Sequence, residues 1–325
     1  MSGSEGRVCE QKTTVGSAFL KRFRRLACKL VAALAVLKEE KIVHADIKPE
    51  NVFIRPTRQW YGRDDHGASD GDGDVVARPD MPVLPRKRRA KGEASLCANF
   101  LSLPSDDFEV NLGDFGNSCH MSEVSKFYQD FNLQSLPYRS PEVLLGVPFG
   151  SQIDIWSLGV VLLELIMGRT LFRCSRREDL FKEMCTVLTP PPLLRFSGGK
   201  YTAELFPVVA AESTHSQLTE ECLAECKCDD AFNVSPCSYN DHIRVIHSLI
   251  ADRFDSSLPC PPDLLHFLGG MLLPDPDIRL TAVDLLVHDF LAADVAVPRT
   301  LLSHHIRSKQ VTRRKCANGL AALRR

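Results

Sequence analysis

The sequence predicts a mainly α-helical fold with a small β element, and three observations carry this prediction. The apolar residues between Phe19 and Leu37 recur at intervals of three and four, which defines one face of an amphipathic helix. Residues 153–167 are apolar on most sides, which is typical of a buried helix. The strand candidates are few and short, at residues 51–54 and 109–112.

Three further helices are predicted toward the C-terminus. They cover Leu180–Leu188, Pro262–Leu273 and Thr281–Leu291, and three consecutive prolines at 190–192 end the first of them. Residues 207–241 show no periodic pattern, so we expect them to be irregular. The sequence shows no internal repeat.

Composition and charge exclude several classes of protein. Of the 325 residues, 44% are hydrophobic and 25% are charged, which is ample for a globular core. A formal net charge of −1 argues against a whole-protein attraction to nucleic acid or acidic membranes. The twelve cysteines are scattered, no apolar stretch near residue 1 has the pattern of a signal peptide, and the longest apolar stretch is too short for a membrane span. We therefore expect a soluble, intracellular, monomeric protein with no membrane partner and no direct nucleic-acid ligand.

One long segment, residues 56–107, differs in composition from the rest of the chain. The segment is rich in aspartates and glycines between Asp64 and Asp74, and it turns basic at Pro85–Lys91. Such a segment buries too little apolar surface to offset the loss of chain entropy on folding. We expect it to be a mostly disordered insertion.

Residues 44–51 read His-Ala-Asp-Ile-Lys-Pro-Glu-Asn, and they are the most informative stretch of the chain. An Asp and an Asn at this spacing suit phosphoryl transfer, because the first accepts a hydroxyl proton and the second holds a magnesium ion. Four further motifs follow in order: Gly-Asp-Phe-Gly (113–116), Tyr-Arg-Ser-Pro-Glu (138–142), Asp-Ile-Trp-Ser-Leu-Gly (154–159) and Asp-Pro-Asp-Ile-Arg (275–279). Chance rarely supplies such an ordered series.

On these motifs the chain resembles the protein kinases of the CMGC group, from about residue 18 to about residue 292. It is most similar to the splicing-associated pre-mRNA-processing kinases and next to the dual-specificity tyrosine-regulated kinases, because Ala45 replaces the usual Arg and Gly-Gly-Lys-Tyr occupies 198–201. The resemblance implies a kinase C-terminal lobe over 18–292, interrupted by the 56–107 insertion. It leaves 1–17 as a short N-terminal segment and 293–325 as a basic tail.

The resemblance assigns roles to four residues. Asp46 corresponds to the catalytic base, and Lys48 to the residue that contacts the transferring phosphate. Asn51 and Asp114 correspond to the magnesium ligands that hold the cofactor ATP. The implied reaction transfers the γ-phosphate of ATP to Ser or Thr of a protein substrate. Arg139 is associated by resemblance with accepting Pro after the target residue.

Other motif residues are expected to be structural. The resemblance implies a buried ion pair between Glu142 and Arg279. It also implies that Asp154 anchors the backbone of the catalytic loop, and that His44 and Phe115 pack between the catalytic site and the core.

The activation segment, Asp114–Glu142, lacks the usual parts of a phosphate switch. Asn132 occupies the position of the phosphotyrosine of the related kinases, and Leu136 and Ala45 replace basic residues that commonly support the phosphate. A phosphate orders a segment through charge-assisted bonds to Arg. We therefore predict no activation by phosphorylation at position 132, with Tyr128 as the substitute site to test.

A complete kinase also needs a Gly-rich loop, a strand Lys and a helix Glu that together hold the nucleotide. Residues 1–17 contain none of these, so we expect the N-terminal lobe to be absent and the isolated chain to be inactive or nearly so. Two hypotheses follow: a Ser/Thr kinase whose polypeptide includes an upstream lobe, and a non-catalytic kinase-like module that binds partners. The four intact site residues favour the first hypothesis, and the missing lobe favours the second.

Two weaker patterns each have two interpretations. The spacing of Cys222, Cys226, Cys228 and Cys237 matches no common zinc site, so free thiols are expected in preference to a metal site. The run Arg86, Lys87, Arg88 and Arg89 fits either a nuclear-import patch or a solvated charge run in a cytoplasmic protein.

Overall fold

The computed structural model describes residues 15–57, 100, 103, 106–128, 131–206, 236–255 and 257–292. The helices of this part of the chain are α1 (Ser17–Glu39), α3 (Pro141–Leu145), α4 (Gln152–Met167), α5 (Arg177–Val187), α6 (Leu193–Phe196), α9 (Pro236–Ile250), α10 (Pro262–Met271), α11 (Ala282–Leu286) and α12 (Asp289–Ala292). Short 3-10 turns include Pro49–Asn51, Phe115–Asn117 and Leu136–Tyr138.

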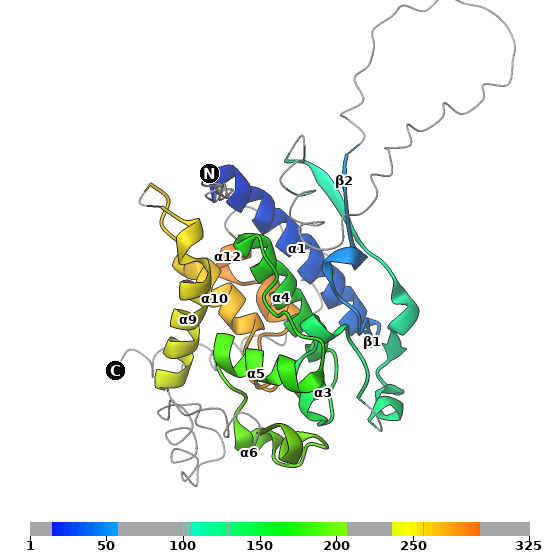
Figure 1. Cartoon of the computed structure of the whole chain (residues 1–325). Helices are drawn as coiled ribbons and strands as arrows, with labels where there is room; N and C mark the ends of the chain where they lie inside the picture. The colour runs from blue at the N-terminus through cyan, green and yellow to red at the C-terminus, as the bar shows by residue number, and fades with distance from the viewer. Residues whose placement is uncertain are drawn as a thin grey trace, which may run out of the picture.

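Helix α4 lies in the middle of the helices, and α1, α9 and α10 pack against it (Figure 1). Every residue from Ile153 to Met167 is buried, which confirms the prediction of a buried helix at this place. Helix α1 buries one face through residues such as Phe23, Leu26 and Leu30, which confirms the predicted amphipathic helix. Because α4 is enclosed on all sides, polar side chains on it have fixed positions and can hold neighbouring segments in place.

Two small antiparallel sheets form the β element, and the sequence predicts the strands of one of them, β2 and β3. Strand β2 (Val52–Pro56) pairs with β3 (Phe108–Leu112), and the register places Val52 opposite Leu112. Strand β1 (Ile42–Val43) pairs with β4 (Cys119–His120). The 44–51 loop therefore runs from the β1–β4 sheet to the β2–β3 sheet. Residues 113–118 connect the same two sheets, from β3 back to β4.

Two regions differ most from the predictions. The single helix expected over 281–291 is two helices, α11 and α12, because the Thr281–Asp284 capping box begins α11 and the chain leaves the helix at Val287. Residues 236–241, expected to be irregular, lie in α9. This helix packs on α10, and such tertiary contact overrides a weak local pattern.

The end of the 56–107 segment is packed against α1. Phe100 is fully buried between Phe19 and Phe108, with ring centroids 5.5 and 6.2 Å away. Arg22 donates a hydrogen bond from Nε to Asp106 Oδ1 at 2.8 Å. The insertion expected to be disordered over 56–107 therefore includes packed residues at its C-terminal end, such as Phe100 and Asp106. Residues 58–99 lie outside the described part of the chain.

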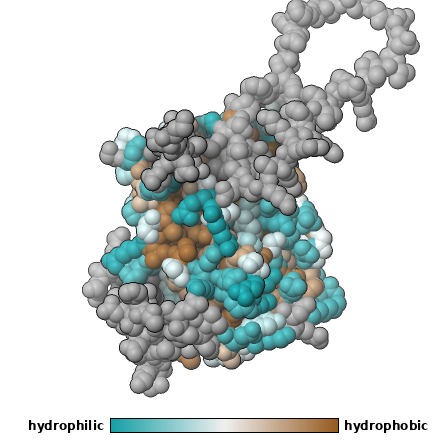
Figure 2. Space-filling view, viewed as in Figure 1, coloured by the Kyte–Doolittle hydropathy of each residue, from teal (hydrophilic) through white to brown (hydrophobic). Residues whose placement is uncertain are grey.

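The surface of the described residues is mainly hydrophilic in the view of Figure 2, and the largest apolar area lies near the middle of this view. No helix in the described part of the chain is long and apolar enough to cross a membrane.

Candidate active site

The 44–51 loop is anchored to the buried end of α4. The backbone N–H groups of His44 and Ala45 donate to the two carboxylate oxygens of Asp154 at 2.8 and 2.9 Å. Burial raises the pKa of Asp154 to about 7, and these two backbone bonds oppose the rise. The predicted anchoring role of Asp154 is confirmed by this geometry.

Asp46 is the most constrained carboxylate of the loop. Its Oδ2 accepts a hydrogen bond from Lys48 Nζ at 2.7 Å, and its Oδ1 accepts one from Ser135 Oγ at 2.7 Å. Desolvation by burial would raise the pKa of Asp46, but the bonds from Lys48 and Ser135 outweigh it and lower the pKa. Asp46 is therefore held ionised and in one orientation.

Asn51 closes the loop onto Asp46 and connects it to the end of strand β3. Its Nδ2 donates to the Asp46 carbonyl oxygen at 2.8 Å, and its own carbonyl accepts from the Gly113 N–H at 2.9 Å. The structure thus brings Asp46, Lys48 and Asn51 into one connected group.

Asp114 follows directly on Gly113, so it lies next to this group. Its backbone is left-handed, with φ 60°, and its exposed carboxylate accepts from the Gly116 N–H at 3.4 Å. A non-glycine residue in this region is uncommon and often marks a functional turn. No hydrogen bond or ion pair joins the Asp114 side chain to Asp46, Lys48 or Asn51 in the described part of the chain.

His44 connects the loop to this turn, whereas Phe115 is less buried than expected. The His44 Nε2–H donates to the Gly113 carbonyl at 3.1 Å, and Nδ1 accepts from the Asp46 N–H at 3.3 Å. Burial lowers the pKa of His44, which favours this neutral form. The Phe115 ring meets His44 at 4.7 Å, but 46% of Phe115 is exposed, so only one of the two predicted packing residues is in the core.

Two residues of the site were missed by sequence reasoning. Ser135 binds Asp46 through its hydroxyl, and Asn117 Nδ2 lies 3.4 Å from Asp46 Oδ2. Neither stands at a spacing that marks a site, and both residue types are common in turns. Only the fold brings them to the catalytic loop.

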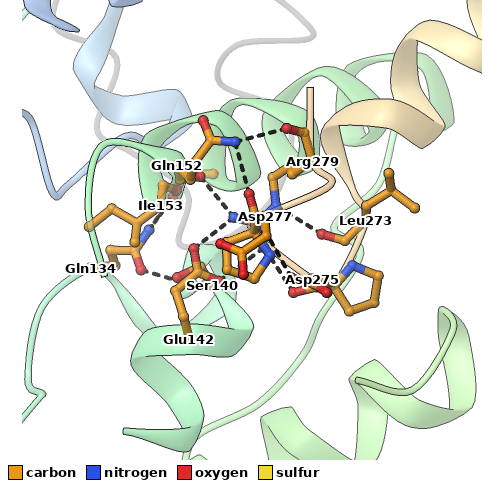
Figure 3. Close-up of polar contacts among 12 residues, drawn as sticks. Gln134, Ser140, Glu142, Gln152, Ile153, Leu273, Asp275, Asp277 and Arg279 are labelled. Carbon is orange, nitrogen blue, oxygen red and sulfur yellow. Dashed lines mark hydrogen bonds and ion pairs between the residues drawn. The ribbon is translucent and has the colours of Figure 1, made fainter. Parts of the chain in front are cut away.

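Glu142 and Arg279 form the predicted buried ion pair (Figure 3). The pair is bidentate, with Nη1 to Oε1 at 2.7 Å and Nη2 to Oε2 at 2.9 Å. Arg279 also donates to the carbonyl oxygens of Leu273, Pro274 and Gln152 at 2.8, 3.0 and 2.8 Å. The prediction is confirmed, and the pair fixes the end of the activation segment to the chain before α11.

The activation segment is tied to α4 by uncharged contacts as well. Gln134 donates from Nε2 to Ser157 Oγ at 2.7 Å and to the Ile153 carbonyl at 3.0 Å, and its Oε1 accepts from the Ser140 N–H. Its backbone N–H donates to the Ala45 carbonyl at 3.1 Å. Gln134 therefore links the activation segment, α4 and the catalytic loop.

The position expected for a phosphotyrosine carries a neutral side chain, which contacts Arg139. Asn132 Oδ1 lies 3.4 Å from Nη2 of Arg139. The Tyr128 hydroxyl donates to the Phe149 carbonyl at 2.9 Å and accepts from the Phe149 N–H at 3.3 Å. Phosphorylation of Tyr128 would therefore disrupt a packed turn. The absence of activation at position 132 stays a prediction.

Other sequence patterns lie outside the described residues. These are Cys222, Cys226 and Cys228, the side chain of Cys237, the run Arg86–Arg89 and the tail 293–325.

The fold and the five ordered motifs are those of a protein kinase domain, and comparison with known families agrees. Residues 97–291, more than half of the chain, match the protein kinase domain. The chain therefore belongs to the protein kinase family. The matched range begins after the 44–51 loop, so it does not test the roles of Asp46, Lys48 and Asn51, which stay predictions.

Individual relatives are CMGC-like kinases. The chain is 26% identical to the dual specificity protein kinase YAK1 of Saccharomyces cerevisiae, over 82% of this chain and 29% of that protein. It is 26% identical to the serine/threonine-protein kinase AFC3 of Arabidopsis thaliana, over 84% and 58%. It is 30% identical to the human homeodomain-interacting protein kinase 4, over 54% and 21%. The chain thus spans less than two thirds of the length of each of these relatives.

Proposed function

We propose that this chain carries a protein Ser/Thr kinase site of the CMGC type, which transfers the γ-phosphate of ATP to Ser or Thr of a protein. The observation that carries the proposal is the arrangement around Asp46. Lys48 and Ser135 each hold one of its carboxylate oxygens at 2.7 Å, which keeps the group ionised and oriented. A general base needs both properties to receive a proton from a substrate hydroxyl.

Asn51 and Asp114 would hold the magnesium ion. The Asn51 side chain donates both of its hydrogen bonds from Nδ2, which leaves Oδ1 available, and Asp114 offers an exposed carboxylate. Amide and carboxylate oxygens are the hard donors that magnesium prefers. The bound ion would neutralise charge on the ATP phosphates, and Lys48 would contact the phosphate that is transferred.

The protein substrate is proposed to carry Pro after the target residue, as Arg139 implies by resemblance. Arg139 donates to the carbonyl oxygens of Leu133 and Gln134, which shapes the part of the activation segment next to Ser135. A splicing-associated role and a nuclear location are the more specific proposals, the latter from the Arg86–Arg89 run.

Nucleotide binding also needs groups that cover the phosphates and the base. The Phe53 ring lies against Gly113, where an added Cβ would come within 2.6 Å of it, and Phe53 is 55% exposed. Phe115, beside the same turn, is also exposed. These two rings mark the apolar face on which a nucleotide-covering element would pack.

The test is phosphate transfer from labelled ATP to a Ser-Pro peptide by the purified chain with magnesium. We expect Asp46→Asn to lower the rate by about 10²- to 10⁴-fold, the range for loss of a general base. Asp277→Asn is the matched control, because Asp277 is exposed and pairs only with Arg195 on the surface. Measurable transfer at equal rates by the two variants would contradict the assignment of Asp46.

The second candidate is a non-catalytic kinase-like module. It is favoured by one observation: the described sheets are two-stranded pairs, and no described strand carries a lysine. Absence of transfer together with absence of magnesium-dependent ATP binding would support this candidate.

A further inference from the structure

The turn from Phe131 to Gln134 in the activation segment has a strained backbone. Both end residues are left-handed, with φ 50° and 63°, and both side chains are buried. L-residues with side chains of this size rarely adopt that region, and they keep it only where surrounding contacts hold them. The contacts that hold this turn therefore determine whether the segment keeps its shape.

Two arginines bind the oxygen atoms of this turn, and we call them the two-arginine clamp. Arg139 donates to the carbonyl oxygens of Leu133 and Gln134 at 2.9 and 3.0 Å. Arg177, the first residue of α5, donates from Nη2 to the Phe131 carbonyl at 3.3 Å. Burial lowers the pKa of Arg139 to about 10, and the nearby charge of Arg177 adds to this effect, so Arg139 stays charged at neutral pH.

Arg177 joins this turn to two other segments. Its Nη1 donates to the carbonyl oxygens of Val143, at 3.1 Å, and Leu144, both in α3. Its guanidinium carbon lies 4.0 Å from the centre of the Tyr201 ring. A planar guanidinium can donate in two directions and stack on an aromatic face at the same time, which an ammonium group cannot do.

Aromatic packing on the other side of the turn completes this arrangement. The Phe131 ring stacks on Tyr128 with centroids 5.6 Å apart and meets Phe149 at 6.1 Å and Tyr201 at 6.4 Å. Every contact of the clamp with the turn uses a neutral oxygen acceptor. None of them requires a phosphate group.

We propose that Arg177 is a positioning residue that holds the activation segment in its substrate-binding form without phosphorylation. The inference rests on the proposed function, because the segment contacts a substrate only if the chain acts as a kinase. It goes further by naming the group that replaces the phosphate switch. Arg177 acts through the backbone of Phe131, and so through the neighbouring turn that carries Ser135 to Asp46.

Hydrogen–deuterium exchange on the full chain tests this proposal without ATP or substrate. The chain is expressed in bacteria, treated with phosphatase and shown by mass spectrometry to be unphosphorylated. We expect the Phe131 and Gln134 amides, which donate to Phe127 and Ala45, to be protected in this wild-type protein. Arg177→Met should raise their exchange rates by about tenfold or more, since hydrogen bonds to a charged group are lost.

Three comparisons make the result specific. Arg176→Met removes the neighbouring arginine, which is exposed and pairs with Asp179, and should leave the exchange rates unchanged. Arg177→Lys should restore part of the protection, because an ammonium can still reach one carbonyl oxygen. Amides of α4 and of the β2–β3 pair should not change in any variant.

The proposal is overturned if the unphosphorylated wild-type turn exchanges freely, or if Arg177→Met and Arg176→Met behave alike. If Arg177→Met fails to fold, Arg177→Lys and Tyr201→Leu decide the question, and unchanged protection of the turn in both contradicts it. Because the assay measures no catalysis, a failure of the clamp and a failure of the kinase proposal give separate results.

Discussion

The pKa values of two buried carboxyl groups, Asp46 and Glu164, shift in opposite directions because their hydrogen-bond partners differ. Asp46 is ionised by bonds from Lys48 and Ser135, whereas Glu164 on α4 receives only neutral donors, the Tyr138 hydroxyl at 3.0 Å and the Leu171 N–H at 2.8 Å. Burial raises the pKa of Glu164 to about 7 from its ordinary value of 4.5, against the opposing effect of these two bonds. A buried acid with a raised pKa favours its protonated form in the folded state.

Glu164→Gln should change how stability depends on pH. The folded protein holds the Glu164 proton more tightly than the unfolded chain, so this group's contribution to stability falls as pH rises from 4.5 through about 7. Gln has no such proton and can keep both bonds, with its oxygen toward Leu171 and its amide toward Tyr138. The melting temperature of the variant relative to wild type should therefore be higher at pH 8 than at pH 5. The exposed Glu204→Gln serves as control, and an equal difference at both pH values would contradict the expectation.

At the scale of elements, the connection between the activation segment and the chain before α11 depends on one ion pair. Arg279 and Glu142 are both almost fully buried, and the Arg279 guanidinium also lies 5.2 Å from the Trp156 ring of α4. Removing one partner leaves the other charge buried without compensation. The loss of stability is then far larger than for a pair at the surface.

Arg279→Met should lower the free energy of unfolding by about 3–5 kcal/mol, because it leaves Glu142 as an unpaired buried charge. Arg195→Met, which breaks the surface pair with Asp277, should cost about 0–1 kcal/mol. Urea unfolding of both variants measures the difference. Similar losses would show that the buried pair is not the main link. The double variant Glu142→Met with Arg279→Met should recover only part of the loss, since three carbonyl oxygens also lose their donor.

The sequence predicts elements with strong periodicity better than elements that depend on distant contacts. The helix expected from the Phe19–Leu37 pattern is α1, and the strands expected at 51–54 and 109–112 are β2 and β3. The two-residue strands β1 and β4 could not be predicted, because their only pairing is with each other across the catalytic loop. Helix α9 was not predicted, because its sequence carries only a weak local pattern and the helix is supported by packing on α10.

The residues of the site also divide into those that a local motif identifies and those that only the fold brings into place. The motifs identify Asp46, Lys48 and Asn51, which the fold brings together. Ser135 is 89 positions from Asp46, and no local pattern indicates that its hydroxyl binds that carboxylate. Arg177 is likewise part of no motif, although it bonds to both the activation segment and α3.

At the scale of the whole molecule, α4 is the platform for the site. It holds the catalytic loop through Asp154, Gln134 through Ser157, and Tyr138 through Glu164. These three polar contacts come from one buried helix, so the segments they hold have fixed positions relative to one another. Phosphoryl transfer depends mainly on positioning and on charge stabilisation, which such an arrangement supports.

The most direct test of the central claim, that this platform presents a magnesium–nucleotide site, is calorimetric titration of the purified chain with ATP, with and without magnesium. We predict magnesium-dependent binding that Asp114→Ala abolishes. The matched control is Glu109→Ala, which removes an exposed carboxylate of β3 that pairs with Arg55 and should leave binding unchanged. Binding that is absent, independent of magnesium, or equally strong after Asp114→Ala would contradict the assignment of this site.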